Sequence, residues 1–138
     1  MRPLLILFFL IFGLNLYSQR KEDTVKLDMN MMAQNLVYDS NEVDELAHFP
    51  GGEVAWEKYL LVNLKYPKIP EKGRKIYLSF VVEKDGRITD AVITYGLNAK
   101  YDEEALRLLR SSGKWIPATV KTKKVRSKGN IFIRFGAG

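Results

Sequence analysis

Residues 75–95 read KIYLSFVVEKDGRITDAVITY, and this stretch decides the fold. Ile76, Leu78, Phe80 and Val82 alternate with side chains suited to solvent, which predicts a strand buried on one face. The Asp85-Gly86 pair suits a two-residue type I′ hairpin turn, so the chain is expected to return as a second strand from Ile88 to Tyr95. The apolar parity changes within the return strand, which predicts a β-bulge near Thr89 and Asp90.

A helix is expected before this hairpin. It begins at Glu53, after Phe49-Pro50-Gly51-Gly52, whose glycines tolerate backbone angles that other residues resist. It should stop near Tyr66, because Pro67 disfavours helical geometry in the residue before it. The stripe at spacings of three and four contains Trp56, Tyr59, Leu60, Asn63 and Leu64.

A second helix and a last strand are expected after the hairpin. Asp102 is predicted to cap the helix, with Glu103 and Glu104 in its first turn and Gly113 beyond its end. Its buried stripe contains Ala105, Leu108 and Leu109. The strand Asn130–Phe135 presents three apolar groups on one face, namely Ile131, Ile133 and Phe135.

The predicted fold class is therefore α+β, with the order helix, strand, strand, helix, strand. The second helix must carry the chain back across the sheet, so the last strand lands beside the first. The sheet is then three-stranded and antiparallel, in the order second, first, third, with both helices on one face. The last strand lies at an edge, where its backbone N–H and C=O groups are unpaired.

The N-terminal segment has the layout of a secretory signal peptide. Arg2 is followed by the apolar run Leu4–Leu16 and by the small residue Ser18. Residues 1–18 are thus predicted to be a signal peptide, or else a short membrane anchor, although a spanning helix needs about 20 apolar residues. Residues 19–46 form a polar lead-in and residues 47–138 the folded domain. Either way, the remainder of the chain is expected to leave the cytoplasm.

Charge narrows the range of partners. The formal net charge is +6, and after Glu104 the chain has no acid and nine Lys and Arg. A basic end suits nucleic acid, an anionic membrane or an acidic protein, and a solvated loop is the plain alternative. Export argues against nucleic acid.

No catalytic residue, cofactor site or metal site is predicted. The chain has no cysteine and one histidine, His48. Asp102, Glu103 and Glu104 are explained by the helix dipole, and Pro50-Gly51-Gly52 lacks the Lys and Ser/Thr of a phosphate loop. The cluster of Met29, Met31 and Met32 has no His or Cys beside it, so a copper(I) site is disfavoured.

Five motifs in order resemble the TonB C-terminal domain, in the form common in Bacteroidota-type bacteria. They are Phe49–Gly52 (FPGG), Leu64–Pro67 (LKYP), Leu78–Gly86 (LSFVVEKDG), Asp102–Leu106 (DEEAL) and Lys114–Ala118 (KWIPA). The resemblance covers about residues 49–135. It implies a periplasmic domain that grips an extended segment, the TonB box, of an outer-membrane TonB-dependent transporter.

The resemblance also implies strand addition at the sheet edge, linked to energised import of nutrients or iron chelates. The residues expected to bind the partner belong to the edge strand and the flanking basic loop, and they are Arg126, Lys128, Asn130, Ile131, Phe132, Ile133, Arg134 and Phe135. A complete inner-membrane transducer that contacts proton-driven motor proteins is the alternative, and a small exported enzyme is a remote one. The N-terminal segment lacks the usual motor-contact histidine and a Pro-rich spacer. Free sheet edges also allow a homodimer.

Overall fold

The computed structural model describes residues 2–65 and 73–136. The chain divides into two compact units, residues 1–36 and residues 37–138, which are described separately.

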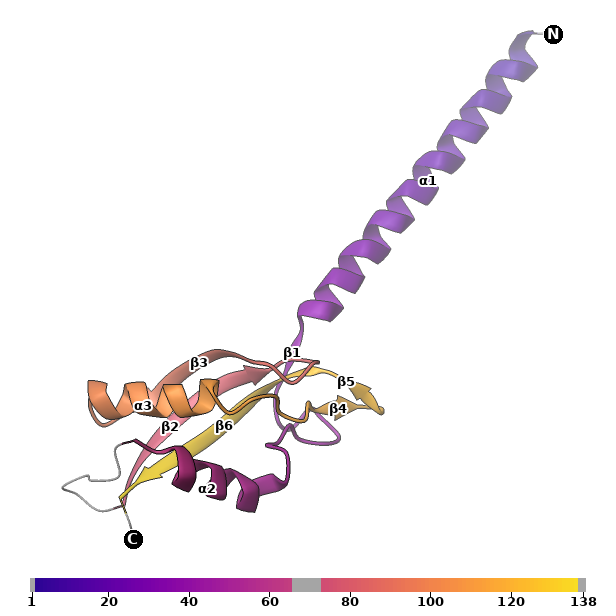
Figure 1. The fold of residues 1–138 in the computed structure, drawn as a ribbon. Helices are drawn as coiled ribbons and strands as arrows, with labels where there is room; N and C mark the ends of the chain where they lie inside the picture. The colour runs from indigo at the N-terminus through magenta and orange to yellow at the C-terminus, as the bar shows by residue number, and fades with distance from the viewer. Residues whose placement is uncertain (1, 66–72, 137–138) are drawn as a thin grey trace. The chain divides into compact units, whose positions relative to one another are not determined.

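The first unit is the helix α1, Arg2–Asn35, drawn in indigo and purple in Figure 1. Its apolar first half continues without a break into the polar residues expected to form a lead-in. In the described part of the chain, α1 is the one helix long and apolar enough to cross a membrane, and a signal sequence passes the same test.

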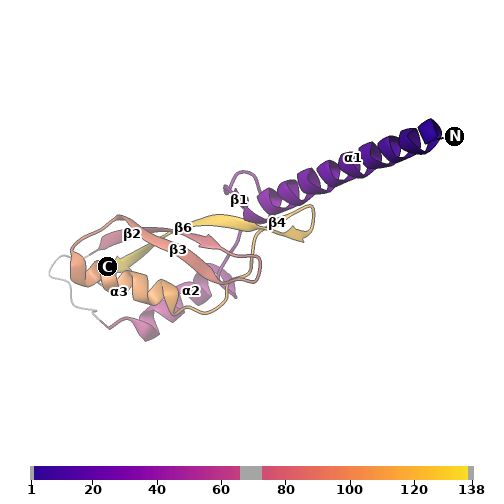
Figure 2. The same cartoon turned by 90° about the horizontal axis from the view of Figure 1, so that it is seen from above.

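The second unit is built on a four-stranded sheet in the order β1-β6-β2-β3 (Figures 1 and 2). Its strands are β1 (Val37–Tyr38), β2 (Arg74–Val82), β3 (Ile88–Tyr95) and β6 (Arg126–Phe135). β2 is antiparallel to both β3 and β6, as predicted. The prediction of a three-stranded, wholly antiparallel sheet is wrong in one respect. β1 adds a fourth strand, parallel to β6, which two residues are too short to signal in the sequence.

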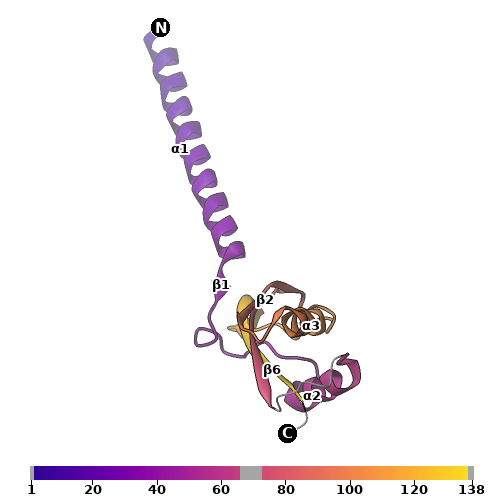
Figure 3. The ribbon, with the colours of Figure 1, turned by 90° about the vertical axis from the view of Figure 1, so that its left-hand side faces the viewer.

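Both helices of this unit lie on one face of the sheet (Figure 3). They are α2 (Gly52–Asn63) and α3 (Ala99–Arg110). α2 begins after a tight turn in which the Gly52 N–H donates to the Phe49 carbonyl at 2.8 Å and Gly51 has φ of 89°. Pro at the second and Gly at the third position of this turn match a type II turn. α2 ends at Asn63, while the stop predicted near Tyr66 and Pro67 lies outside the described residues.

α3 starts one turn earlier than predicted. Asn98 is its N-cap, and the Asn98 side chain accepts a hydrogen bond from the Tyr101 N–H at 3.2 Å. Asp102, predicted as the cap, lies inside the first turn and accepts from the Leu97 N–H at 2.9 Å. Asn caps a helix as well as Asp does, and the residues that follow it can continue the helix.

The β2–β3 turn also differs from the prediction. A type I′ turn needs positive φ at both central residues, and here Gly86, at 88°, has positive φ while Asp85 does not. The Gly86 N–H donates to the Glu83 carbonyl at 2.9 Å, which places Lys84 and Asp85 at the centre of the turn, and the Glu83 N–H donates to the Arg87 carbonyl at 2.9 Å, which closes the three-residue loop of Lys84, Asp85 and Gly86. The predicted bulge is confirmed: the β2–β3 register shifts between Ser79 and Val81.

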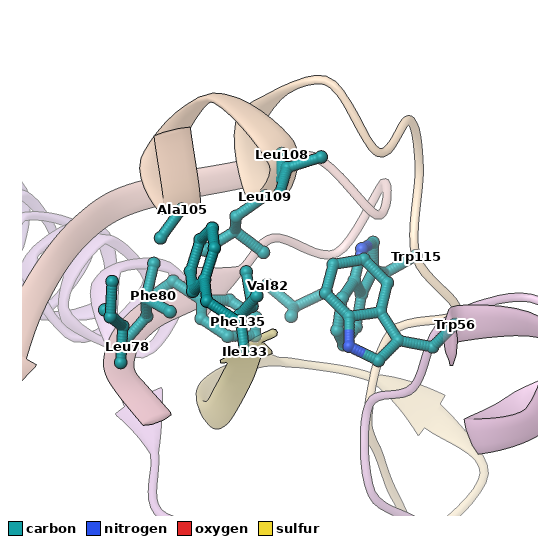
Figure 4. Packing of buried hydrophobic residues seen from close by; sticks show 11 residues of the cluster. Trp56, Leu78, Phe80, Val82, Ala105, Leu108, Leu109, Trp115, Ile133 and Phe135 are labelled. Carbon is teal, nitrogen blue, oxygen red and sulfur yellow. The ribbon is translucent and has the colours of Figure 1, made fainter. Parts of the chain in front are cut away.

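The core lies between the sheet and the two helices (Figure 4). Phe80, with 2% of its surface exposed, lies at its centre and contacts Trp115 with ring centroids 5.2 Å apart. The Phe80 ring also lies directly against Gly129, its register partner on β6, so closely that a Cβ at Gly129 would overlap the ring. The core is composed of Trp56, Ile76, Leu78, Phe80, Val82, Ala105, Leu108, Leu109, Trp115, Ile133 and Phe135.

Phe80→Ala should lower the free energy of unfolding by roughly 3–5 kcal/mol, because it removes a buried ring and leaves a cavity. Lys84→Ala, at an exposed position in the turn, should leave it nearly unchanged. Urea denaturation of the two variants and the parent measures this difference. Equal midpoints for the two variants would show that the ring does not support the core.

Candidate partner-binding edge

β6 has one paired side and one largely open side. On one side it pairs with β2 from Ser127 to Phe135. On the other side β1 covers Arg126 and Ser127. Within residues 37–65 and 73–136, no strand pairs with the outer side of β6 beyond Ser127. The open edge predicted for the last strand is therefore present beyond Lys128, because β1 already pairs with the start of β6.

The backbone of β6 points to the open edge at every second residue. The Glu83 N–H donates to the Arg87 carbonyl at 2.9 Å, so the polar groups of Glu83 face β3. The backbone N–H and C=O groups point to alternate sides along a strand, so the polar groups of Val82 and Phe80 face β6. The β2–β6 register is unbroken, and it therefore directs the polar groups of odd-numbered β6 residues toward β2. The N–H and C=O groups that face outward belong to Lys128, Asn130, Phe132 and Arg134.

The side chains of β6 alternate with the same period. Ile133 and Phe135 are buried against the helices, and Ile131 packs at the margin of the core. Phe132 and Arg134 lie on the opposite, open face of the sheet. Phe132 and Arg134 thus combine backbone groups that face the open edge with side chains on the open face of the sheet.

The predicted basic residues at the start of β6 are held by acids. Arg126 donates from Nε to the Glu83 carboxylate at 2.7 Å, and Thr89 donates to the same carboxylate at 2.7 Å. The hydrogen bonds from Arg126 lower the pKa of the Glu83 carboxyl below its ordinary value. Lys128 pairs with Asp39 at 2.8 Å, which raises the pKa of the Lys128 amine. These two ion pairs therefore join β6 to the residue after β2 and to the residue after β1.

The segment predicted as a basic loop forms a hairpin of β4 (Thr119–Val120) and β5 (Lys123–Lys124). Its two turn residues have positive φ, 49° at Lys121 and 67° at Thr122, without a glycine. The Lys121 N–H donates to the Asp44 carboxylate at 2.6 Å, and the Asp44 N–H donates to the Thr119 carbonyl at 2.9 Å. Without Asn-Gly or Asp-Gly at its turn, this hairpin has no local sequence signal.

Two further titratable groups, Glu104 and His48, have structural contacts. The buried Glu104 accepts hydrogen bonds from Arg107 and from the Lys65 N–H, which lowers the pKa of its carboxyl and joins α3 to the end of α2. His48 lies 3.0 Å from the Leu46 carbonyl through Nδ1 and belongs to an isolated bridge with Ile116. Among the described residues, no group of three or more His, Asp or Glu could hold a metal ion.

Comparison with protein families gives one match. The model described as the Gram-negative bacterial TonB protein C-terminal matches residues 62–136. The chain belongs to this TonB C-terminal family. No curated protein and no solved structure matches the chain. Members of the TonB C-terminal family are non-enzymatic, transport-associated domains that generally interact with outer-membrane transporters, and they face the periplasm.

Glu83→Gln should destabilise the domain at neutral pH by about 1–3 kcal/mol, because it removes charged hydrogen bonds from Arg126. Folding lowers the pKa of Glu83, so the ion pair stabilises at pH values above the ordinary pKa of 4.5. This stabilisation is lost as the pH falls through the lowered pKa. Urea titrations between pH 7 and pH 3 should therefore show the parent and the variant converging in acid.

Asp85→Asn is the matched control, because the Asp85–Arg87 pair is exposed on both sides and contributes little. A constant gap between the parent and Glu83→Gln across this pH range would exclude Glu83 as the titrating group.

Proposed function

We propose that this domain binds an extended peptide of an outer-membrane TonB-dependent transporter by adding it as a strand to β6. The binding would be linked to energised import of nutrients or iron chelates. The observation that carries the proposal is the open side of β6, where, among the described residues, Asn130, Phe132 and Arg134 direct unpaired backbone groups outward. Family membership supplies the class of partner.

Strand addition suits this edge for a physical reason. Backbone hydrogen bonds provide most of the affinity, so the partner must be extended while its sequence can vary. β1 already pairs with the same side of β6 at Arg126 and Ser127, and this pairing supports the proposal. The exposed lysines of the β4–β5 hairpin would speed encounter with an acidic segment, an effect that weakens in salt.

For the N-terminal segment we propose cleavage after Ser18, which would release residues 19–138 to the periplasm, with residues 47–138 as the binding domain. Part of residues 19–46 already contacts this domain. β1 pairs with β6, and the Asp44 carboxylate accepts a hydrogen bond from the Lys121 N–H.

The second candidate is an uncleaved, inner-membrane transducer. The continuous helix α1, which runs past Ser18 to Asn35, favours it. In that case α1 would contact the motor proteins and place the domain in the periplasm.

Cleavage predicts a mature protein that begins at or near Gln19 and is released with the periplasmic fraction. Mass spectrometry of the protein recovered from cells measures this directly. Full-length protein that stays in the inner membrane after carbonate washing would support the transducer instead.

Phe132→Pro should abolish binding of a transporter's N-terminal peptide while the fold is retained, because it removes an N–H that faces the open edge. Ile133→Pro should damage the sheet, because it removes an N–H that faces β2 together with a buried side chain. Peptide titration by calorimetry, with circular dichroism of both variants, separates the two effects.

Phe132→Thr is the control, since it removes the ring and keeps the N–H. It should bind the isolated peptide nearly as the parent does. Edge capture is wrong if Phe132→Pro is folded and binds the peptide with the parent's affinity.

A further inference from the structure

The face of the sheet opposite the helices carries a row of aromatic side chains. Phe132 on β6, Tyr77 on β2 and Tyr95 on β3 are register neighbours. Their ring centroids are 5.9 Å apart from Phe132 to Tyr77 and 6.2 Å apart from Tyr77 to Tyr95. The exposed fractions are 43% for Phe132, 42% for Tyr77 and 64% for Tyr95. These three residues are named the aromatic row.

Two cations flank the aromatic row on the same face. Lys75 and Arg134 are direct register partners, and the Lys75 Nζ lies 4.2 Å from the centroid of the Phe132 ring. Like charges at directly opposite positions destabilise a pair of strands. Among the described residues, neither cation forms an ion pair. This contrasts with Arg126 and Lys128 at the other end of β6, each of which has an acid.

The aromatic row is continuous with the proposed binding edge. Phe132 and Arg134 contribute backbone groups to the edge and side chains to this face, while Tyr95 lies two strands away. A strand added to β6 would therefore end beside Phe132 and could not reach Tyr95. A partner larger than a single strand is needed to cover all three rings.

We propose that the aromatic row, with Lys75 and Arg134, is a second docking surface for the same partner. It would receive a folded, acidic and apolar-bearing surface of the transporter that adjoins the captured strand. This inference rests on the proposed function. Lys75 and Arg134, which have no ion pair among the described residues, would attract carboxylates, and the exposed rings would pack against apolar or aromatic side chains. The edge then captures an extended segment, and this face distinguishes the whole partner from other extended peptides.

The test compares an isolated N-terminal peptide with the complete, detergent-solubilised transporter from which the peptide is taken. Tyr95→Thr removes the ring farthest from the edge and keeps a residue suited to a strand. It should bind the peptide as the parent does, and its affinity for the complete transporter should fall by about tenfold. Leu61→Ser, at an exposed apolar position of α2, is the matched control and should bind both as the parent does.

Lys75→Glu separates loss of docking from loss of stability. It replaces a pair of like charges by an opposite pair with Arg134, so the melting temperature should stay level or rise. Its affinity for the complete transporter should nevertheless be lower than the parent's, and this difference between variant and parent should become smaller as salt is added.

Parent-like binding of the complete transporter by both Tyr95→Thr and Lys75→Glu would overturn the proposal. If the parent binds the transporter but not the peptide, and Tyr95→Thr weakens that binding, edge capture fails and the docking surface stands. If the parent binds neither probe, both the docking surface and edge capture are wrong.

Discussion

The packing of the Phe80 ring on Gly129 is the constraint on which the rest of the sheet depends. A Cβ at Gly129 would overlap the ring unless the ring shifted, so glycine is the residue that fits opposite Phe80 in this packing. This contact favours the observed register of β2 and β6, and a slip of one residue would exchange every inward and outward side chain of β6. The fixed register buries Ile133 and Phe135 and leaves Phe132 beside the open edge.

The sequence predicted the elements whose signals are local and repeated. Two local patterns predicted which side chains are buried, and both agree with the structure. They are the alternation from Ile76 to Val82 and the stripe of Ala105, Leu108 and Leu109. The cap of α3 and the type of the β2–β3 turn were wrong because neighbouring residues suit competing geometries. β1 and the β4–β5 hairpin were missed because each depends on partners distant in the chain, such as Arg126 for Val37 and Asp44 for Lys121.

At the candidate site, too, local patterns predicted some features, while contacts between residues distant in the sequence were missed. Alternation alone assigned Phe132 and Arg134 to the open face, and no structure was needed for that. The ion pairs of Arg126 with Glu83 and of Lys128 with Asp39 join residues far apart in sequence, so their structural role was not foreseen. The cations on and beside β6 thus divide into Arg126 and Lys128, which are held by acids, and Lys75 and Arg134, which have no ion pair among the described residues. The TonB C-terminal family generally interacts with outer-membrane transporters, and we propose that the cations without an ion pair lie where this chain contacts such a partner.

The central claim is that β6 captures an extended segment through every second backbone amide. Residue-resolved hydrogen exchange of the domain, with and without a transporter's N-terminal peptide, tests it most directly. In the free domain the amides of Asn130, Phe132 and Arg134 should exchange much faster than those of Ile131 and Ile133, and the peptide should slow the fast set. Unchanged exchange at the even-numbered amides in the presence of saturating peptide would contradict the claim.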